Sequence, residues 1–471
     1  MTLVAGVDSS TQSCKLEVRD ADTGELVRSG HRPHPVTVPP RSEQDANAWW
    51  DALSSLLDEH GRDVAALSVA GQQHGMVVLD EERRVVRPAK LWNDTESAPQ
   101  ARALVEAWGA TRWADTVGTV PVASITITKL AWLREHEPEH FVRVAHVLLP
   151  HDWLTLQLTR ELVTDRGDAS GTGYWSAGTG DYLPDALALV GLDPSVAPRV
   201  LAPGACAGTC GDVLIAAGTG DNMGAALGLG LQTGDVAISL GTSGTVFAVA
   251  AHQTHDPTGA VAGFADAAGR FLPLVCTLNA TKVTDTMARL LGRDRSDLEQ
   301  LALACAPGAG GVVLLPFFDG ERTPNLPDAS GLLTGLRSAT EPAQLARAAH
   351  EGVVCNLLDA LDALRDVGVP TDDGRVVVVG GGARSPVYPQ LIADLLQRTV
   401  EVPPAGEYVA RGACVQAVAA LSGRDVGAVS LEWAPSNPGR VEPDPAVDAA
   451  AVRDAYRAAR LHAYPESGAA S

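Results

Sequence analysis

One stretch of the chain, residues 213–249, sets two glycine turns and an acid directly beside apolar strands. The run 213–217 predicts a strand, and a Gly-Thr-Gly turn then leads into Asp221 and Asn222. A second predicted strand, 236–240, ends in the turn Gly-Thr-Ser-Gly at 241–244. An acid on a strand-to-helix turn lies at the carboxyl edge of a sheet, where open α/β folds bind ligands, and glycine-turn N–H groups suit a phosphate. Although each motif alone also fits an ordinary helix cap or hairpin, together they predict an α/β fold with a candidate base beside a phosphate turn.

Length and charge restrict the class of protein. A chain of 471 residues is too long for one ordinary core and predicts two or three domains. Its formal net charge of −21 argues against a nucleic-acid partner, because phosphate backbones demand basic patches, but does not exclude ATP. We see no signal peptide and no apolar run that could span a bilayer, so we expect a cytoplasmic protein without a membrane partner. Seven scattered cysteines fit a reducing compartment.

A hairpin near the N-terminus resembles the later one. Residues 3–19 predict strand, polar turn and strand, with Asp8 where the first strand ends. When Val4 is laid on Val236, the hydroxyl-rich turn 9–11 falls on 241–243. Two halves, each with a polar hairpin, would clamp the phosphates of a nucleotide between them. Any α/β protein has several hairpins, so this repeat alone does not decide the function.

Two polar clusters suit a sugar or polyol. Gln72, Gln73 and His74 stand between glycines at the end of a predicted strand, 64–71, and offer several hydrogen-bonding groups. Trp92 is followed by an amide and an acid, Asn93 and Asp94, a set that suits a sugar ring or chain. A structural histidine and a core tryptophan are the alternative interpretations.

The rest of the chain alternates predicted helices, strands and loops. We expect helices over 45–60, 97–115, 146–160, 344–366 and 388–396, and a loop over 164–174. The strand 376–379 runs into a glycine triplet, 380–382, where a flat ligand can lie against the backbone. We divide the chain into domains 1–232 and 233–435 and a tail, 436–471, whose last few residues we expect to be disordered.

The order of these motifs resembles the FGGY carbohydrate kinases. It reads DSSTQS, GQQHG, WND, GTGDN, SLGTSGT and GGGARSP, and it extends over about residues 3–430. Residues 124–136 fit the first signature of the family, and 331–351 nearly fit the second, departing at His350. The resemblance implies two ribonuclease-H-like domains, as in actin and hexokinase, with a catalytic cleft between them.

The resemblance also implies roles for individual residues. Asp221 matches the general base that takes the proton of the sugar hydroxyl, and Asp8 matches an acid that holds Mg²⁺, with Asp221 as a second metal contact. The implied substrate-binding residues are Gln73, His74, Trp92, Asn93, Asp94, Asp221 and Asn222. The implied ATP-binding residues are Ser10, Thr11, Ser13, Lys15, Gly241, Thr242, Ser243, Gly244, Gly381, Gly382 and Ala383.

Within the family, the loop GQQHG resembles the form found in members that phosphorylate D-xylulose to D-xylulose 5-phosphate. Ribulose, gluconate or glycerol remain alternative substrates, and a non-catalytic, sugar-binding actin-like protein is the alternative class. An NAD enzyme fits less well, because the glycine after Gly218-Thr219-Gly220 is Gly224, one position beyond the fingerprint spacing. A P-loop kinase is excluded because the chain has no Gly-Lys pair. The sequence does not determine the oligomeric state, and a homodimer remains open.

Overall fold

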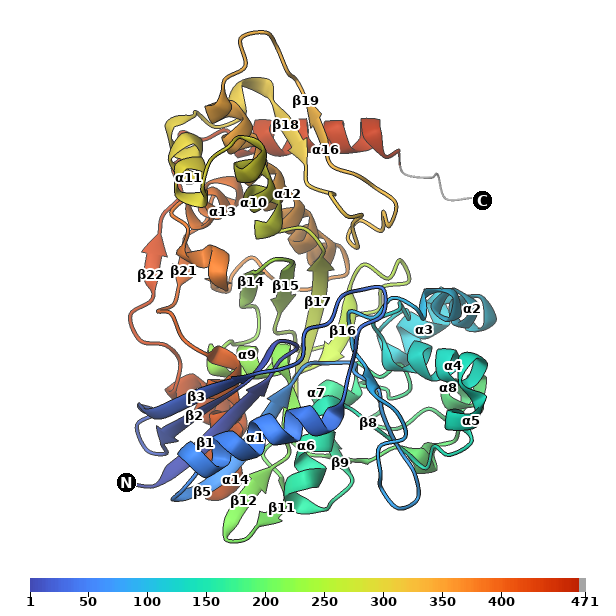
Figure 1. Ribbon diagram of the computed structural model, residues 1–471. Coiled ribbons are helices and arrows are strands. Elements are labelled where there is room, and N and C mark those ends of the chain that lie inside the picture. The colour runs from blue at the N-terminus through green and yellow to red at the C-terminus, as the bar shows by residue number, and fades with distance from the viewer. Residues whose placement is uncertain (466–471) are drawn as a thin grey trace. The chain divides into compact units, whose positions relative to one another are not determined.

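A computed structural model describes residues 1–465, which fold into two compact units (Figure 1). The first unit holds 1–232, 249–273 and 405–435, and the second holds 233–248, 274–404 and the chain from 436 onward. The chain first leaves the first unit after Gln232, where the sequence placed a boundary, but two later segments return to that unit. The disorder expected at the C-terminal end concerns residues 466–471, which lie outside the described residues.

The first unit is built on a mixed sheet with the order β11-β12-β5-β1-β2-β3. Strands β12, β5 and β1 run parallel, whereas β1-β2, β2-β3 and β11-β12 are antiparallel pairs. The strand bounds are β1 Leu3–Ser9, β2 Ser13–Asp20, β3 Leu26–Pro33, β5 Val64–Gly71, β11 Cys206–Cys210, β12 Val213–Ala216 and the short β13 Thr219–Gly220, which pairs with β5.

Helices cover both faces of this sheet. Successive residues of β1 point to opposite faces and all are buried, so both faces must be covered. Ala5 and Val7 point into a core that includes Trp49 of α1 (Ala46–His60) and Trp153 of α6 (Pro150–Thr159). Gly6 faces the other way, onto α14 (Tyr408–Ser422), and a Cβ there would lie 2.0 Å from the carbonyl oxygen of Ala410. Figure 1 shows α14, in orange-red, beside the blue strands β1 and β5, which it contacts.

Glycines let α14 cross α9 (Asp221–Gly228) at close range. A Cβ on Gly412 would lie 1.9 Å from the carbonyl oxygen of Gly224, and one on Gly228 would lie 2.0 Å from that of Tyr408. The small-residue run after Asp221 therefore forms a closely packed helix. This crossing holds the helix that begins with Asp221 against the back of the sheet.

Three predicted segments of the first unit differ from the structure. The predicted helix 97–115 is divided at Gly109, which has a φ of 83°, into α2 (Ala98–Trp108) and α3 (Ala110–Val117). Residues 146–148 are not helical but form strand β8 (His146–Leu148), which pairs with β6 (Val77–Leu79), and the helix begins at Pro150. The predicted loop 164–174 opens with strand β9 (Val163–Asp165) and the short helix α7 (Arg166–Ala169). The other described elements of this unit are β4 Glu43–Gln44, β7 Ala89–Lys90, α4 Thr126–His136, α5 Pro138–Phe141, α8 Pro184–Leu189, η1 Pro194–Val196, β10 Arg199–Leu201, β16 Ala262–Ala265 and α15 Val426–Glu432.

The second unit repeats the central arrangement of the first. Its sheet runs β17-β15-β14-β20-β21-β22, with β14-β15 an antiparallel hairpin and β20 parallel to β14. The hairpin β1-β2 stands in the same way beside parallel β5. The elements of this unit are β14 Val236–Leu240, β15 Gly244–Ala248, β17 Phe271–Thr277, α10 Thr281–Leu290, α11 Arg295–Ala304, η2 Ala309–Gly311, β18 Val313–Leu315, β19 Leu332–Thr334, α12 Pro342–Asp366, β20 Val376–Val379, η3 Gly381–Arg384, α13 Tyr388–Leu396, β21 Val400–Val402, β22 Gly439–Val441 and α16 Ala449–Ala463.

The segment beyond residue 435, which the sequence set apart as a tail, contains folded elements of the second unit. Strand β22 pairs with β21, and α16 contacts β18, α12 and α13. Among residues 1–465, no helix has both the length and the apolar character needed to cross a bilayer.

Candidate active site

Strand register in the first unit brings two carboxylates to one edge of the sheet. Asp8 pairs with Ala70 of β5, and Thr219 of β13 pairs with the same residue from the other side. One step on, Ser9 and Gly220 flank Gly71 in the same way. The chain then leaves β13 at Asp221, so this carboxylate and that of Asp8 stand on either side of the end of β5.

Asp8 is a buried acid with an unused oxygen. Its Oδ2 lies 3.6 Å from Lys15 Nζ across the hairpin, while its Oδ1 is buried and accepts no hydrogen bond from the described residues 1–465. Burial raises the pKa of Asp8 to about 6, against the opposing charge of Lys15 and with a further rise from Glu407. Lys15 Nζ itself lies 2.6 Å from Glu407 Oε2.

Asp221 is not a helix cap, the alternative that its position suggested. Gly220 occupies the cap position of α9, and Asp221 Oδ1 accepts hydrogen bonds from its own neighbour, Asn222, through backbone N at 2.8 Å and side-chain Nδ2 at 2.9 Å. Burial raises the pKa of Asp221 to about 7, with smaller contributions from the negative charges of Asp8 and Asp168. A carboxyl group with this pKa exchanges a proton readily near neutral pH.

The turn after β5 lies against the same helix start. Asn222 Nδ2 donates to Gln73 Oε1 at 2.9 Å, and Gln73 Nε2 is buried without a hydrogen-bond acceptor among residues 1–465. A Cβ on Gly220 would lie 2.6 Å from Gln73 Cγ, so only glycine lets the two segments approach this closely. Gln73, Asn222 and Asp221 therefore form one connected polar group.

His74 is held in one orientation. It adopts a positive φ of 64°, and its Nδ1–H donates to the carbonyl oxygen of Gly171 at 2.9 Å. Its ring centroid lies 5.3 Å from that of Phe264 on β16. A Cβ on Gly171 would lie 2.4 Å from the imidazole ring, so a glycine is needed at 171 as well.

The predicted Trp92-Asn93-Asp94 cluster divides into two parts. Trp92 is 37% exposed and donates from Nε1 to Thr11 Oγ1 at 2.8 Å, and Asn93 Oδ1 is buried without a donor among the described residues. Asp94 is fully buried, and its Oδ2 accepts from Ser42 N and from Lys90 Nζ, both at 2.9 Å. The carboxylate of Asp94 thus stabilises the loop, and no part of it is exposed for the sugar contact that the sequence suggested.

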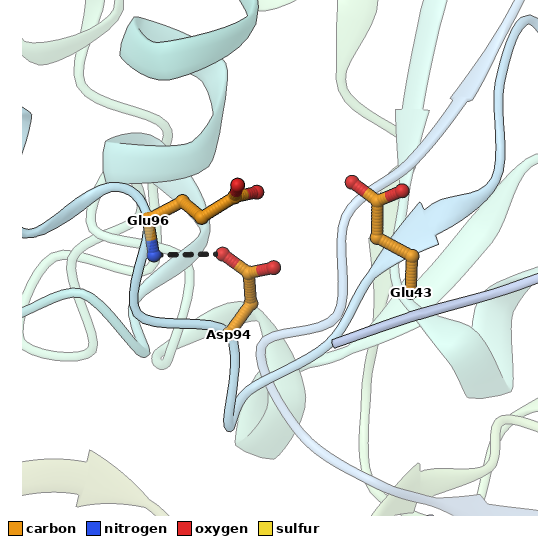
Figure 2. Close-up of side chains that lie close together, drawn as sticks. All are labelled: Glu43, Asp94 and Glu96. Carbon is orange, nitrogen blue, oxygen red and sulfur yellow. Dashed lines mark hydrogen bonds between the residues drawn. The ribbon is translucent and has the colours of Figure 1, made fainter. Parts of the chain in front are cut away.

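Asp94 belongs to an acidic cluster with Glu43 and Glu96 (Figure 2), whose carboxylates lie close enough together to suggest a cation site. Lys90 supplies that cation. Its fully buried Nζ lies 3.2 Å from Glu43, 2.9 Å from Asp94 and 2.5 Å from Glu96, and 3.9 Å from the centroid of the Trp132 ring. The cluster is therefore an internal ion-pair network and gives no indication of a metal site.

Both predicted phosphate hairpins are closed turns. In the first unit, Ser13 O accepts from the backbone N and the Oγ of Ser10, each at 3.0 Å. In the second unit, Gly241 N donates to Ser243 O at 3.0 Å, and Thr281 at the start of α10 donates to Gly241 O through its backbone N at 3.0 Å and its Oγ1 at 2.9 Å. These hydrogen bonds fix the conformation of each turn before a phosphate binds.

The predicted adenosine loop borders a cavity within the second unit. Gly380 has a φ of 87°, and the 3₁₀ turn Gly381–Arg384 follows it. A cavity of about 240 Å³ is lined there by Gly381, Gly382, Thr284, Arg295, Glu299 and Tyr388, among others. A larger cavity of about 470 Å³, between β18, α12 and α16, includes none of the predicted site residues.

Several residues at these sites were not found from the sequence. Glu407, the partner of Lys15, precedes α14 and lies almost 400 positions away in the chain. Tyr388, Arg295 and Thr284 of the nucleotide-side cavity have no motif of their own. His151 and Asp152 did leave a signal, a charged pair in an otherwise apolar run, which the helix prediction for 146–160 passed over.

These features define a class of protein. One unit offers a carboxyl group of raised pKa beside amide and imidazole groups suited to a polyol, and the second repeats its fold with a glycine turn and a cavity suited to a nucleotide. These groups are the ones that an ATP-dependent kinase acting on a small hydroxylated molecule requires.

Family comparisons agree. Residues 3–228 match the N-terminal domain of the FGGY family of carbohydrate kinases, and residues 236–421 match its C-terminal domain. The chain belongs to the FGGY family and is an ATP-dependent carbohydrate kinase.

Several similar proteins carry the name of one kinase within this family. The chain is 52% identical over 444 residues to the xylulose kinase of Streptomyces coelicolor, covering 92% of this chain and 90% of that protein. It is 51% identical over 444 residues to the xylulose kinase of Streptomyces rubiginosus, with the same coverage. The crystal structure of xylulose kinase from Bifidobacterium adolescentis is 41% identical and superposes with a TM-score of 0.86, covering 98% of this chain and 99% of that one.

Proposed function

We propose that this kinase transfers the γ-phosphoryl group of ATP to D-xylulose and yields D-xylulose 5-phosphate. The contact that carries the proposal is Asn222 Nδ2, which donates both to Gln73 Oε1 and to Asp221 Oδ1, each at 2.9 Å. It joins a polyol-reading turn to a carboxylate of raised pKa. Similarity to proteins named xylulose kinase selects the sugar.

Asp221 acts as the general base. Its carboxylate accepts the proton of the attacking hydroxyl, and its raised pKa makes it a better acceptor than an ordinary carboxylate at the same distance. Gln73 Nε2, buried without an acceptor among the described residues, donates to a sugar oxygen. Trp92 and Asn93 border the sugar, and Asp94 supports their loop through Lys90 and Ser42.

The residues present fit a Mg²⁺ ion. Asp8 Oδ1 is buried without a donor, and carboxylate oxygens are the ligands that Mg²⁺ prefers. Asp8 would hold the ion together with Asp221. The ion supplies neutralisation of phosphate charge, which phosphoryl transfer requires more than covalent catalysis. Lys15, 3.6 Å from Asp8, adds a positive charge at the same strand end.

Residues of the second unit bind ATP in this proposal. The backbone of Gly241, Thr242, Ser243 and Gly244 contacts phosphate oxygens, because their turn is already closed by hydrogen bonds to Thr281 and Ala280. Gly381, Gly382 and Ala383 hold the adenosine, and the adjoining cavity of about 240 Å³ receives part of it. Ser10, Thr11 and Ser13 form the matching turn of the first unit.

The test is ADP release with ATP-Mg and a panel of acceptors: D-xylulose, L-xylulose, D-ribulose, L-ribulose, gluconate, glycerol and no sugar. We expect a large rate with D-xylulose and low rates with the others. Selectivity for another polyol would reject D-xylulose but keep the kinase mechanism. The absence of acceptor-dependent ADP release from folded protein would reject both.

A further inference from the structure

A buried histidine lies next to the proposed site, and none of the roles above uses it. His151 is the second residue of α6, and its side chain is fully buried. Its Nδ1 lies 2.6 Å from Asp168 Oδ2, and its Nε2 lies 3.2 Å from Asp152 Oδ1. Among residues 1–465, Asp152 Oδ1 and Asp168 Oδ1 accept no hydrogen bond, although both are buried.

This geometry indicates a charged imidazole ring. Nδ1 donates to Asp168 Oδ2, whereas Nε2 has no hydrogen-bond partner among residues 1–465 but lies 3.2 Å from Asp152 Oδ1, where a positive ring is favoured over a nitrogen lone pair. Burial alone would lower the pKa of His151, but the charges of Asp152, Asp168 and Asp165 and the hydrogen bond to Asp168 raise it above its ordinary value. Burial raises the pKa of the buried Tyr174 phenol, and the charges of Asp152 and Asp168 raise it further, so the phenol stays neutral.

His151 contacts the two turns that carry the proposed site. A Cβ on Gly218 would lie 2.6 Å from His151 Cδ2, and one on Gly71 would lie 3.1 Å from His151 Cβ. Gly71 directly precedes the Gln72-Gln73-His74 turn, and Gly218 begins the turn that ends at Asp221. His151 therefore packs against both turns, with its ring at Gly218 and with its Cβ and backbone at Gly71.

Asp168 belongs to a segment that reaches the same two turns by hydrogen bonds. It lies on α7, which Asp165 caps by accepting from Asp168 N at 2.8 Å. Asp165 Oδ2 also accepts from Thr219 Oγ1 at 2.8 Å, two residues before Asp221. Just beyond α7, Gly171 O accepts from His74 Nδ1 at 2.9 Å. The pair His151–Asp168 thus joins α6, α7 and both site turns.

We propose that His151 and Asp168 form a buried ion pair that positions the sugar-reading turn and the turn carrying Asp221 relative to one another. The inference rests on the proposed sugar-kinase function. His151 is a positioning residue, because it acts through Gly71, Gly218 and α7 and touches no reacting atom.

Single variants and their combination test the pair by steady-state kinetics. In His151→Gln and Asp168→Asn, we expect kcat/KM for D-xylulose to fall about 10- to 100-fold, since small misplacements of catalytic groups cost this much. The KM for ATP should stay within about twofold, because the predicted ATP residues lie on other segments. The kcat/KM of the double variant for D-xylulose should be no lower than that of the less active single variant, as for two residues that act as one unit.

A matched control removes a buried carboxylate elsewhere in the first unit, that of Asp20 at the end of β2. Asp20 accepts from Asp22 N and Thr23 N and pairs with Leu3, at the opposite end of β1 from Asp8. Asp20→Asn should leave kcat/KM for D-xylulose near the wild-type value. Single variants within about twofold of wild type, or a double variant whose loss is the product of the two single losses, would overturn the proposal.

A second measurement uses the wild-type protein and so does not depend on whether a variant folds. Nitrogen-15 NMR of histidine-labelled, substrate-free wild type should show one imidazole with both nitrogens protonated at pH 8, well above the ordinary histidine pKa of about 6.5. If no such imidazolium persists in an active wild type, the positioning pair is rejected while the proposed function stands. A wild type without sugar-dependent ADP release would instead reject the proposed function itself.

Discussion

Asn222 donates a hydrogen bond of 2.9 Å to Gln73, and this contact ties the turn after β5 to the helix that begins at Asp221. The two residues lie 149 positions apart in the chain. Because the same amide nitrogen also donates to Asp221 Oδ1, a change in either turn would be felt at the proposed base. The proposed sugar-binding Gln73 and the proposed base Asp221 are thus parts of one hydrogen-bonded unit.

The pH dependence of catalysis follows from the raised pKa of Asp221. Burial raises this pKa to about 7, so the base form is lost as the pH falls below that value. We expect kcat/KM for the sugar to rise about tenfold per pH unit up to roughly pH 7 and to level off above it. Initial rates at constant ionic strength from pH 5.5 to 8.5 measure this. A flat profile across that range would contradict the assignment.

The same shift predicts how stability changes with pH. A folded-state pKa above the unfolded value favours the protonated native state, so this contribution to stability is present at low pH and lost as the pH rises through about 7. Asp221→Asn should therefore raise the free energy of unfolding more at pH 8 than at pH 5, by on the order of 1 to 3 kcal/mol. Urea unfolding at both pH values checks this, and an equal effect at the two would speak against a raised pKa.

His74 and Gly171 should affect sugar binding through one contact. His74→Ala removes the imidazole. Gly171→Ala places a methyl group 2.4 Å from where the His74 ring now lies, so the ring must move. Both variants should therefore raise the KM for the sugar more than the KM for ATP. Gly439→Ala is the control, because neither glycine has a positive φ and a Cβ on Gly439 would lie 3.4 Å from its nearest neighbour, Val402 O, an ordinary van der Waals contact. If Gly171→Ala leaves the sugar KM unchanged, His74 does not contact the sugar in this orientation.

Lys90 should be a major stabilising residue. Lys90→Met leaves Glu43, Asp94 and Glu96 without their shared cation, and loss of one partner of a buried ion pair typically costs about 3–5 kcal/mol. Lys282→Met, which breaks a partly exposed pair with Asp319, should cost no more than about 1 kcal/mol. Chemical denaturation of both variants compares these costs. Equal, small effects would show that the cluster tolerates its negative charge without the lysine.

Local patterns in the sequence were enough to locate the strand ends that carry Asp8, Gln73 and Asp221. Each of these residues follows an apolar run and has a glycine one or two positions before it, and such a signal does not depend on distant parts of the chain. The hairpins over 3–19 and 236–249 were likewise evident, and the structure places them at equivalent positions in two similar sheets.

Features that depend on distant partners could not be predicted in this way. Residues 146–148 fit a helical pattern, but pairing with β6 makes them a strand. Nothing near Gly6 indicates that α14, from the far end of the chain, covers it. The contact between His151 and Asp168 joins a predicted helix to a predicted loop, and Ser42, whose backbone N donates to the buried Asp94, lies 52 positions from it.

The most direct test of the account compares ADP release by wild type and by Asp221→Asn with saturating ATP-Mg and D-xylulose. We predict that turnover of Asp221→Asn falls by roughly 10² or more, the usual contribution of a general base, while ATP still binds. Turnover within a few-fold of wild type would show that Asp221 is not the base.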